Sequence, residues 1–275
     1  MKIIIRPHDI GRGTSDYLGK TAHQWGFDGV QLAIAKAVEG YTGDPGTLTP
    51  ETIEYIRKGF NENNVEIPIL GAYFNPVHSN KDKVKAGAAK YADHLKHAVE
   101  FGTKYVASET GSFNDDKWTY NPKNQTAEAF KQVLDVFSPM PEIAKQYDSR
   151  MTVEGAWGHC IYCPEVMNNF VKELDNGYVN VIVDILNYLY IGNYQNRNQI
   201  FEQCFKLFKE KIVAFHLKDF VVAGDHFEEV GLGQGIMGWK DFLPIIKQEC
   251  PNAILVFEGV HDVPQSLDFV RGIVG

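Results

Sequence analysis

The chain has 275 residues, of which 44% are hydrophobic and 23% are charged, and it carries a net charge of −8 with a pI of about 5.6. This composition is ordinary for a globular protein and supplies enough apolar residues for a sizeable core. Because phosphate backbones and anionic lipids bind basic surfaces, the acidic balance argues against nucleic-acid and membrane partners.

We expect a cytoplasmic protein, because the sequence carries no export or membrane signal. No apolar run reaches the roughly 18 residues of a spanning helix, and the apolar stretch after Met1 is too short for a signal peptide. The four cysteines therefore fit reduced thiols. Cys160 and Cys163 have the spacing of half a zinc or redox motif, but no second pair accompanies them, and we interpret the spacing as coincidental.

Short apolar runs recur along the chain, and amphipathic segments separate them. Several runs are continuous in Val, Ile and Leu without polar alternation, which is typical of parallel strands covered on both faces. In chain order the predicted strands are Ile3–Arg6, Val30–Leu32, Ile67–Ala72, Tyr105–Ser108, Met151–Val153, Val179–Val183, Ile212–Phe215 and Ile254–Phe257.

The segments between these runs carry the signals of helix ends. Thr49 followed by Pro50 predicts a helix start, with proline in the first turn. Gly26 and Gly102 precede predicted strands, where a glycine at a helix C-terminus belongs. Lys90–Phe101 shows an apolar stripe at helical spacing.

Eight alternating strand and helix units without a linker predict a (β/α)8 (TIM) barrel that forms a single domain over residues 1–275. The alternative is a doubly wound open sheet. Its dinucleotide-binding version is disfavoured, because no Gly-x-Gly-x-x-Gly follows the first predicted strand.

Four of the later predicted strands end in a metal-ligand residue: Glu154, Asp184, His216 and Glu258. The residues are separated by about one βα unit each, and Glu109 ends the preceding strand in the same way. Because the C-terminal ends of parallel barrel strands open on one face, we expect these side chains to converge.

Each of these residues alone is often a helix cap, a solvated loop residue or a hydrogen-bonded core histidine. Together, three carboxylates and an imidazole would crowd like charges into a half-buried mouth, which is costly unless a cation neutralises them. Carboxylate oxygens with one imidazole suit a single divalent ion: Mn2+, Mg2+, Co2+ or Zn2+. No thiolate is needed, so a closed structural zinc site is disfavoured.

Motifs along the whole chain resemble the xylose isomerase-like barrel superfamily, which includes sugar phosphate isomerases, ketose 3-epimerases and abasic-site endonucleases. The most specific are His216-Leu-Lys218-Asp219, the glycine-rich segment 231–235 and the strand that ends in Phe257-Glu258; segment 26–31 also matches. The resemblance implies that Glu154 and Glu258 bind the metal and transfer protons on opposite faces of the substrate carbon. Asp184 and His216 would complete the coordination.

The chain departs from its relatives at two positions. Asn187 stands three residues after Asp184, where epimerases and endonucleases of the family commonly carry histidine, and Gln31 stands where relatives often carry glutamate. His159 either supplies a pocket imidazole in place of that histidine or is an ordinary loop residue.

Further residues at strand ends are expected to line a substrate pocket. The substrate-binding candidates are Arg6, His8, Tyr73, Glu109, His159, Asn187 and Lys218. Lys218 either holds a substrate oxygen or forms a loop ion pair with Asp219. Asn75 also falls near the pocket, whereas packing is the more typical role for Trp118 and Trp157.

These observations together predict a metal-dependent isomerase or epimerase of a small sugar, ketose or sugar phosphate that works by proton transfer through an enediolate. A lyase or dehydratase with the same first step stays open. An abasic-site endonuclease is disfavoured by the acidic charge and Asn187, and a non-catalytic sugar- or metal-binding barrel by the retained Glu154 and Glu258. By resemblance, we also expect a homo-oligomer.

Overall fold

The computed structural model describes residues 1–275 and is a closed barrel of eight parallel strands. Around the barrel the strands follow the order β1-β2-β3-β4-β5-β6-β7-β10, and β10 pairs with β1 to close it. Their bounds are β1 Ile3–Ile5, β2 Gly29–Leu32, β3 Glu66–Gly71, β4 Tyr105–Glu109, β5 Arg150–Glu154, β6 Val179–Asp184, β7 Ile212–Leu217 and β10 Ile254–Phe257. The predicted (β/α)8 barrel is confirmed, and every predicted strand lies in it.

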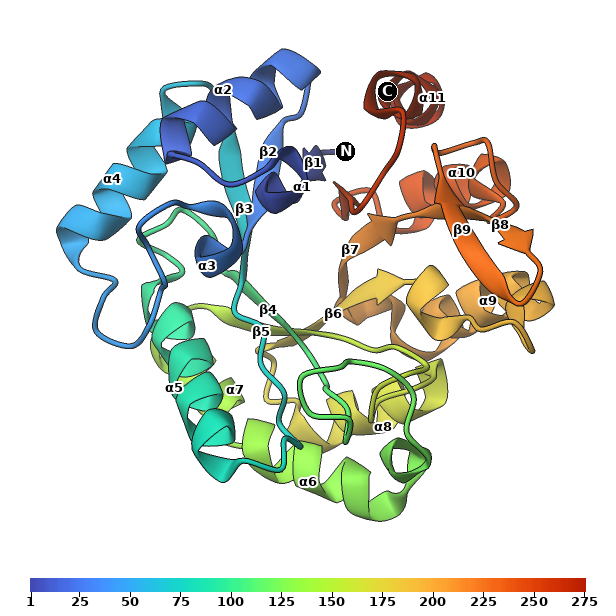
Figure 1. Cartoon of the computed structure of the whole chain (residues 1–275), viewed down its shortest axis with the longest axis horizontal. Coiled ribbons are helices and arrows are strands. Elements are labelled where there is room, and N and C mark those ends of the chain that lie inside the picture. The colour runs from blue at the N-terminus through green and yellow to red at the C-terminus, as the bar shows by residue number, and fades with distance from the viewer.

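Helices surround the ring of strands (Figure 1). The outer helices are α2 Ser15–Trp25, α4 Pro50–Asn61, α5 Lys81–His97, α6 Ala127–Phe137, α7 Met140–Gln146, α8 Pro164–Leu174, α9 Arg197–Phe208, α10 Trp239–Glu249 and α11 Val263–Val274. Short helices occupy the connections: α1 Pro7–Ile10, α3 Ile34–Ala37, η1 Pro122–Gln125, η2 Leu186–Tyr188, η3 Tyr194–Asn196 and η4 Lys209–Lys211. None of the helices is both long and apolar enough to cross a membrane.

The helix ends follow the sequence signals. The Thr49 hydroxyl accepts a hydrogen bond from the backbone N–H of Thr52 at the start of α4. Gly26 and Gly102 have φ values of 92° and 89°, in the left-handed region that favours glycine. One element was not predicted: an antiparallel hairpin of β8 (Asp219–Ala223) and β9 (His226–Val230) that follows β7.

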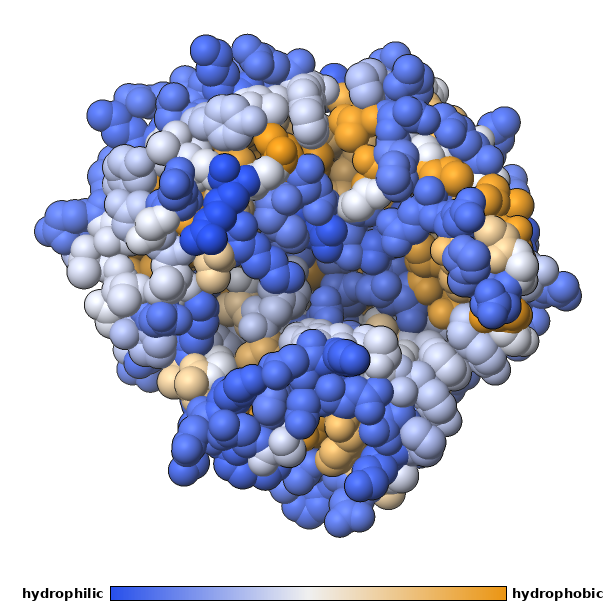
Figure 2. All heavy atoms as spheres, in the orientation of Figure 1, coloured by the Kyte–Doolittle hydropathy of each residue, from blue (hydrophilic) through white to orange (hydrophobic).

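The core has two layers, because alternate residues of a strand point to opposite faces of the sheet. A large cluster packs between the strands and the surrounding helices. A small cluster, which includes Ile4, Ile182 and Val256, fills the barrel interior. Beyond this inner layer the view down the barrel is hollow and lined by hydrophilic residues (Figure 2).

Candidate metal centre

The strand period places a polar layer directly above the apolar interior. Each polar side chain follows an inward residue of its own strand by two positions, so both point into the barrel. The pairs are Ala107 and Glu109, Thr152 and Glu154, Ile182 and Asp184, Ala214 and His216, and Val256 and Glu258. The register of the strands aligns these polar residues between neighbouring strands, since Glu109 pairs with Glu154 and Asp184 pairs with His216.

Glu154, Asp184, His216 and Glu258 come together as the sequence predicts. Each offers one ligand atom, and these four atoms lie within 4.8 Å of one another. The Nδ1 atom of His216 is 2.6 Å from Glu258 Oε2, 3.3 Å from Glu154 Oε2 and 3.8 Å from Asp184 Oδ2. All four residues are buried, with Glu258 the most exposed at 9%.

Two buried atoms in this cluster have no hydrogen-bond partner: His216 Nδ1 and Asp184 Oδ2. The neighbouring charges lie close to both atoms but not in hydrogen-bond geometry. Buried polar atoms are nearly always hydrogen-bonded, and a bound ion is one explanation for buried atoms without such a partner. Three carboxylates and one imidazole therefore fit a divalent cation in both geometry and donor chemistry.

Gln31 sets the orientation and tautomer of His216. The Oε1 atom of Gln31 accepts a hydrogen bond from His216 Nε2 at 2.9 Å, and Gln31 Nε2 donates to the Tyr73 hydroxyl at 2.5 Å. With a proton held on Nε2, Nδ1 is the atom that faces the carboxylates, and a bound cation would take its lone pair in place of the second proton. An outer partner that fixes the tautomer of a histidine ligand is typical of metal sites.

Lys218 points into the cluster. Its ammonium lies 2.9 Å from Asp184 Oδ2 and 2.5 Å from Glu258 Oε1, so its partners are the proposed ligands and not Asp219. Arg6 lies 2.7 Å from the same oxygen of Glu258 and is itself held by Asp9. The loop ion pair considered for Lys218 and Asp219 is therefore wrong.

Asp219 binds backbone N–H groups of the following loop, which explains the glycines that follow the His-x-Lys-Asp motif. Its buried carboxylate accepts hydrogen bonds of 2.9–3.1 Å from the backbone N–H groups of Phe220, Gly233, Gly235 and Met237. A Cβ atom at Gly235 would lie 2.2 Å from Asp219 Oδ1, so only glycine fits there. Trp239 then donates to the carbonyl oxygen of Lys218 at 2.8 Å. The loop thus fixes the backbone from which Lys218 reaches the cluster.

Asn187 connects the ligands in place of the histidine common in relatives. Its Nδ2 atom donates to Glu154 Oε1 at 2.6 Å, and its Oδ1 atom accepts from Lys218 Nζ at 3.2 Å. Its backbone N–H donates to Asp184 Oδ1 at 3.0 Å. An amide in this position can orient carboxylates, but it cannot exchange protons at neutral pH.

Glu109 and His159 form the neighbouring wall of the mouth. Burial raises the pKa of Glu109 to about 8, and the carboxylates of Glu154 and Glu258 add to the effect. His159 Nε2 lies 3.8 Å from Glu109 Oε2, and burial lowers the pKa of His159 to about 4. The Trp118 ring meets the His159 ring edge-on, with 5.5 Å between centroids. The structure thus places His159 beside the site.

The charges of the cluster shift the pKa values of its members in opposite directions. Burial raises the pKa of Asp184 to about 6, although Lys218 opposes this. Burial would lower the pKa of His216, but the charges of Glu154 and Glu258 outweigh burial and raise this pKa to about 10. Burial would raise the pKa of Glu258, yet Lys218 and His216 hold it well below its usual value. Lys218 and His216 thus compensate the negative charge of Glu258, and such strongly perturbed pKa values mark a candidate functional site.

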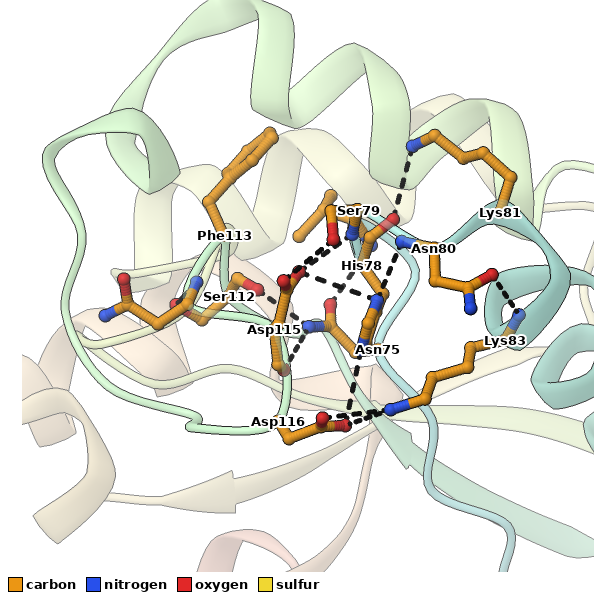
Figure 3. Close-up of polar contacts among 12 residues, drawn as sticks. Asn75, His78, Ser79, Asn80, Lys81, Lys83, Ser112, Phe113, Asp115 and Asp116 are labelled. Atoms are coloured by element: carbon orange, nitrogen blue, oxygen red, sulfur yellow. Dashed lines mark hydrogen bonds and ion pairs between the residues drawn. The ribbon is translucent and has the colours of Figure 1, made fainter.

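A polar network joins the loops that follow β3 and β4, next to this wall (Figure 3). The Asn75 side chain donates to the carbonyl oxygens of Ser112 and Asp115, each at 2.7 Å. The backbone N–H and hydroxyl of Ser79 both donate to the Asp115 carboxylate at 2.8 Å. Asn75, which was expected to line the pocket, instead uses its amide to fasten the loop that carries Trp118.

The remaining candidates lie around the mouth. His8 lies half-buried in α1, where burial lowers its pKa to about 4 and the Arg6 charge adds to this. The Lys36 ammonium lies over the Tyr73 ring, 4.8 Å from its centroid. Glu229 of β9 faces Glu258 and Lys218 and was missed, because only the unpredicted hairpin brings it there. The apolar run Phe220–Ala223 directly before the turn at Gly224 was the available signal.

Comparisons with known proteins agree with this geometry. The sequence model of the family described as xylose isomerase-like TIM barrel matches residues 20–272. A search of curated protein sequences finds no match.

Several solved structures share the fold at low sequence identity. A D-tagatose 3-epimerase-like protein superposes with a TM-score of 0.75 at 19% identity, covering 100% of this chain and 98% of its own. The IOLI protein, whose crystal structure holds a zinc atom, superposes with a TM-score of 0.73 at 14% identity. A probable 3-DHS dehydratase, AsbF from Bacillus anthracis, superposes with a TM-score of 0.72 at 14% identity. Both matches cover 100% of this chain and 98% of the other chain. At these identities the likeness establishes the fold alone.

Proposed function

Because the chain belongs to the xylose isomerase-like TIM barrel family, we propose that it is a metal-dependent isomerase or epimerase of a small carbohydrate. The observation that carries the proposal is the convergence of Glu154, Asp184, His216 and Glu258 on one point, with two buried atoms that lack partners. The D-tagatose 3-epimerase-like neighbour and the zinc atom of the IOLI protein support the same choice by analogy.

The site residues divide the chemistry of proton transfer among them. A bound Mn2+, Mg2+, Co2+ or Zn2+ ion would polarise a substrate carbonyl and its neighbouring hydroxyl. One of Glu154 and Glu258 removes the proton from the carbon beside the carbonyl, and the other returns a proton to the opposite face. Asp184 and His216 would hold the ion together with Glu154 and Glu258.

The polar residues around the barrel mouth supply the contacts that hold and orient the sugar. Lys218 lies 2.5 Å from Glu258 and can stabilise the negative charge of the enediolate oxygen. Arg6, His8 and Tyr73 bind the substrate from one side of the mouth, and Glu109, His159 and Asn187 bind it from the other. Asn187 orients Glu154 through its 2.6 Å hydrogen bond and takes no proton itself.

Two alternatives share parts of this site. A dehydratase would begin with the same proton abstraction and then expel a hydroxyl group, and the AsbF neighbour keeps that reaction second. An abasic-site endonuclease would need further histidines for additional metals. Asn187 is committed to Glu154 and Lys218, and the structure gathers a single four-residue metal cluster, so this alternative is not favoured.

Deuterium exchange tests the proposal directly. Purified protein with Mn2+ is incubated in D2O with a panel of ketoses, aldoses and their phosphates, and the C–H positions are followed by NMR. We expect deuterium at one carbon next to a carbonyl and an epimer or isomer as product, and no such product with Glu258→Gln, because one of the two proton-transfer groups is then missing. Glu249→Gln, which changes an exposed carboxylate on α10, is the matched control. Epimer or isomer that still forms with Glu258→Gln contradicts the proton-transfer role, and loss of water from the product identifies the dehydratase.

A further inference from the structure

A second hollow lies outside the barrel mouth, where the start of α8 faces the side of α9. Its volume is about 330 Å³, at the lower end of the range for small-molecule pockets, which is about 300–1,000 Å³. Trp157 and Tyr162, from the loop between β5 and α8, form one wall. Figure 1 shows α8 and α9 side by side on this flank of the barrel.

The opposite wall is a stripe of amide side chains. Gln199 and Gln203, four residues apart, lie on one face of α9, and Asn196, directly before the start of α9, also lines the hollow. Solvated helix faces usually carry charged residues, yet these three positions carry none. Two more amides, Gln125 and Asn193, also line the hollow, and Glu165 is the one charged residue that does so.

This lining has the chemistry of a carbohydrate site. A primary amide offers both donors and an acceptor, and a sugar hydroxyl likewise donates and accepts. Aromatic rings provide apolar faces with a polar edge, which suits the C–H face of a sugar ring. A phosphate or carboxylate ligand would need Lys or Arg, and neither lines the hollow.

We propose that this hollow between α8 and α9 is a second ligand site, which binds an uncharged saccharide independently of the metal centre. Gln199 and Gln203 hydrogen-bond its hydroxyl groups, and Tyr162 packs against its ring. Trp157 contributes only its edge, because its indole is already stacked between Tyr120 and Tyr190, with 4.5 and 4.2 Å between ring centroids. A neighbouring hollow of about 420 Å³ shares Gln125 and Tyr162 with it. The site can therefore hold one sugar unit and let a second extend along α8.

The loop between β5 and α8, which forms one wall of this second site, also borders the metal centre on its other side. The backbone N–H of Trp157 donates to the carbonyl oxygen of Asn187 at 2.7 Å, and the Asn187 side chain donates to Glu154. His159, two residues after Trp157, faces Glu109 on the other side. A saccharide in the hollow therefore packs against the segment that positions His159, without contact with the metal ligands.

Ligand-observed NMR on metal-stripped protein tests the second site. The probes are neutral mono- and disaccharides, each compared with its phosphorylated form, and dissociation constants are measured for four proteins. These are the wild type, the double variant Gln199→Ala/Gln203→Ala, the mouth variant Glu258→Gln, and Gln195→Ala, an exposed amide of η3 that does not line the hollow. Thermal melting checks that each variant is folded.

We expect a neutral sugar to bind the wild type, Glu258→Gln and Gln195→Ala with equal affinity, and the double variant to bind it about tenfold more weakly, as for two lost hydrogen bonds. Asn196→Ala, at the helix start, serves as a second variant should the double variant be unstable. Absence of any neutral-sugar binding by the wild type overturns the proposal. So does binding that fails in Glu258→Gln and persists in the double variant, or tighter binding of the phosphorylated sugar. Loss of the proposed catalysis alone leaves these expectations unchanged, because the metal centre is not used.

Discussion

The hydrogen bond from His216 to Gln31 offers the sharpest test of how the metal centre is built. The substitution Gln31→Leu keeps the size of a buried side chain but removes the acceptor of His216 Nε2. The Nε2 proton then has no partner, and the imidazole can adopt the tautomer with the proton on Nδ1. In that tautomer the atom facing Glu154 and Glu258 no longer carries a lone pair.

The expected loss follows from the cost of that missing partner. Loss of an outer partner of a histidine ligand typically weakens metal binding by about 10- to 100-fold, which corresponds to about 1.4–2.8 kcal/mol. A buried donor left unpaired costs a similar amount, about 1–3 kcal/mol. We therefore expect Gln31→Leu to bind Mn2+ at least tenfold more weakly than wild type in isothermal titration calorimetry.

Two control variants separate the possible causes. Gln31→Glu keeps an acceptor for Nε2 and should bind Mn2+ at least as well as wild type. Tyr73→Phe removes the other partner of Gln31, the 2.5 Å bond to its amide, and should change the affinity little. Unchanged affinity in Gln31→Leu, or an equal loss in Tyr73→Phe, would refute the role assigned to the His216 tautomer.

Further predictions concern the loop, the fold and the charge of the site. Gly235→Ala places a Cβ atom 2.2 Å from Asp219 Oδ1, and this overpacking should lower the free energy of unfolding by about 2 kcal/mol in urea titrations. Gly272→Ala, with open space around it, should instead stabilise helix α11 by up to about 1 kcal/mol. Equal effects of the two alanines contradict the close fit at Asp219. Burial lowers the pKa of His94 to about 4, so the unfolded chain takes up a proton at higher pH than the folded one; stability is then complete above pH 6.5 and falls by about 2 kcal/mol from this residue between pH 7 and pH 5. This loss of stability between pH 7 and pH 5 should vanish in His94→Gln. If the wild type and His94→Gln lose stability equally over that range, His94 is not the cause. Lys218→Met removes a positive charge 2.9 Å from Asp184 and should tighten Mn2+ binding while it abolishes turnover; weaker binding would show that the ammonium supports the ion.

The barrel and the convergence of Glu154, Asp184, His216 and Glu258 could be predicted because both follow from local pattern. Continuous apolar runs indicated strands covered on both faces, and the last residue of a strand belongs to the mouth in any parallel barrel. The side chains of Glu154 and Asp184 therefore had to point inward, two positions beyond Thr152 and Ile182. No contact between distant residues had to be known.

What could not be predicted depends on partners that are distant in the sequence. Gln31 and His216 are 185 positions apart, and their hydrogen bond follows only from the closed ring of strands. Lys218 could equally have paired with the adjacent Asp219, and only the folded glycine loop shows that this carboxylate is filled by backbone N–H groups. The hairpin β8–β9 is short, half-exposed and outside the barrel. Its first strand has an apolar run, Phe220–Ala223, but the second has only Phe227 and Val230, so the pair lacks the pattern that marks two strands.

Anomalous diffraction from crystals grown with Mn2+ measures most directly whether Glu154, Asp184, His216 and Glu258 hold one divalent ion. We predict a single strong anomalous peak in the barrel mouth, bonded to His216 Nδ1 and to one oxygen from each of the three carboxylates, with Lys218 displaced from Asp184. A mouth without a peak at saturating Mn2+, or a peak bound by other residues, would contradict the assignment of these four side chains.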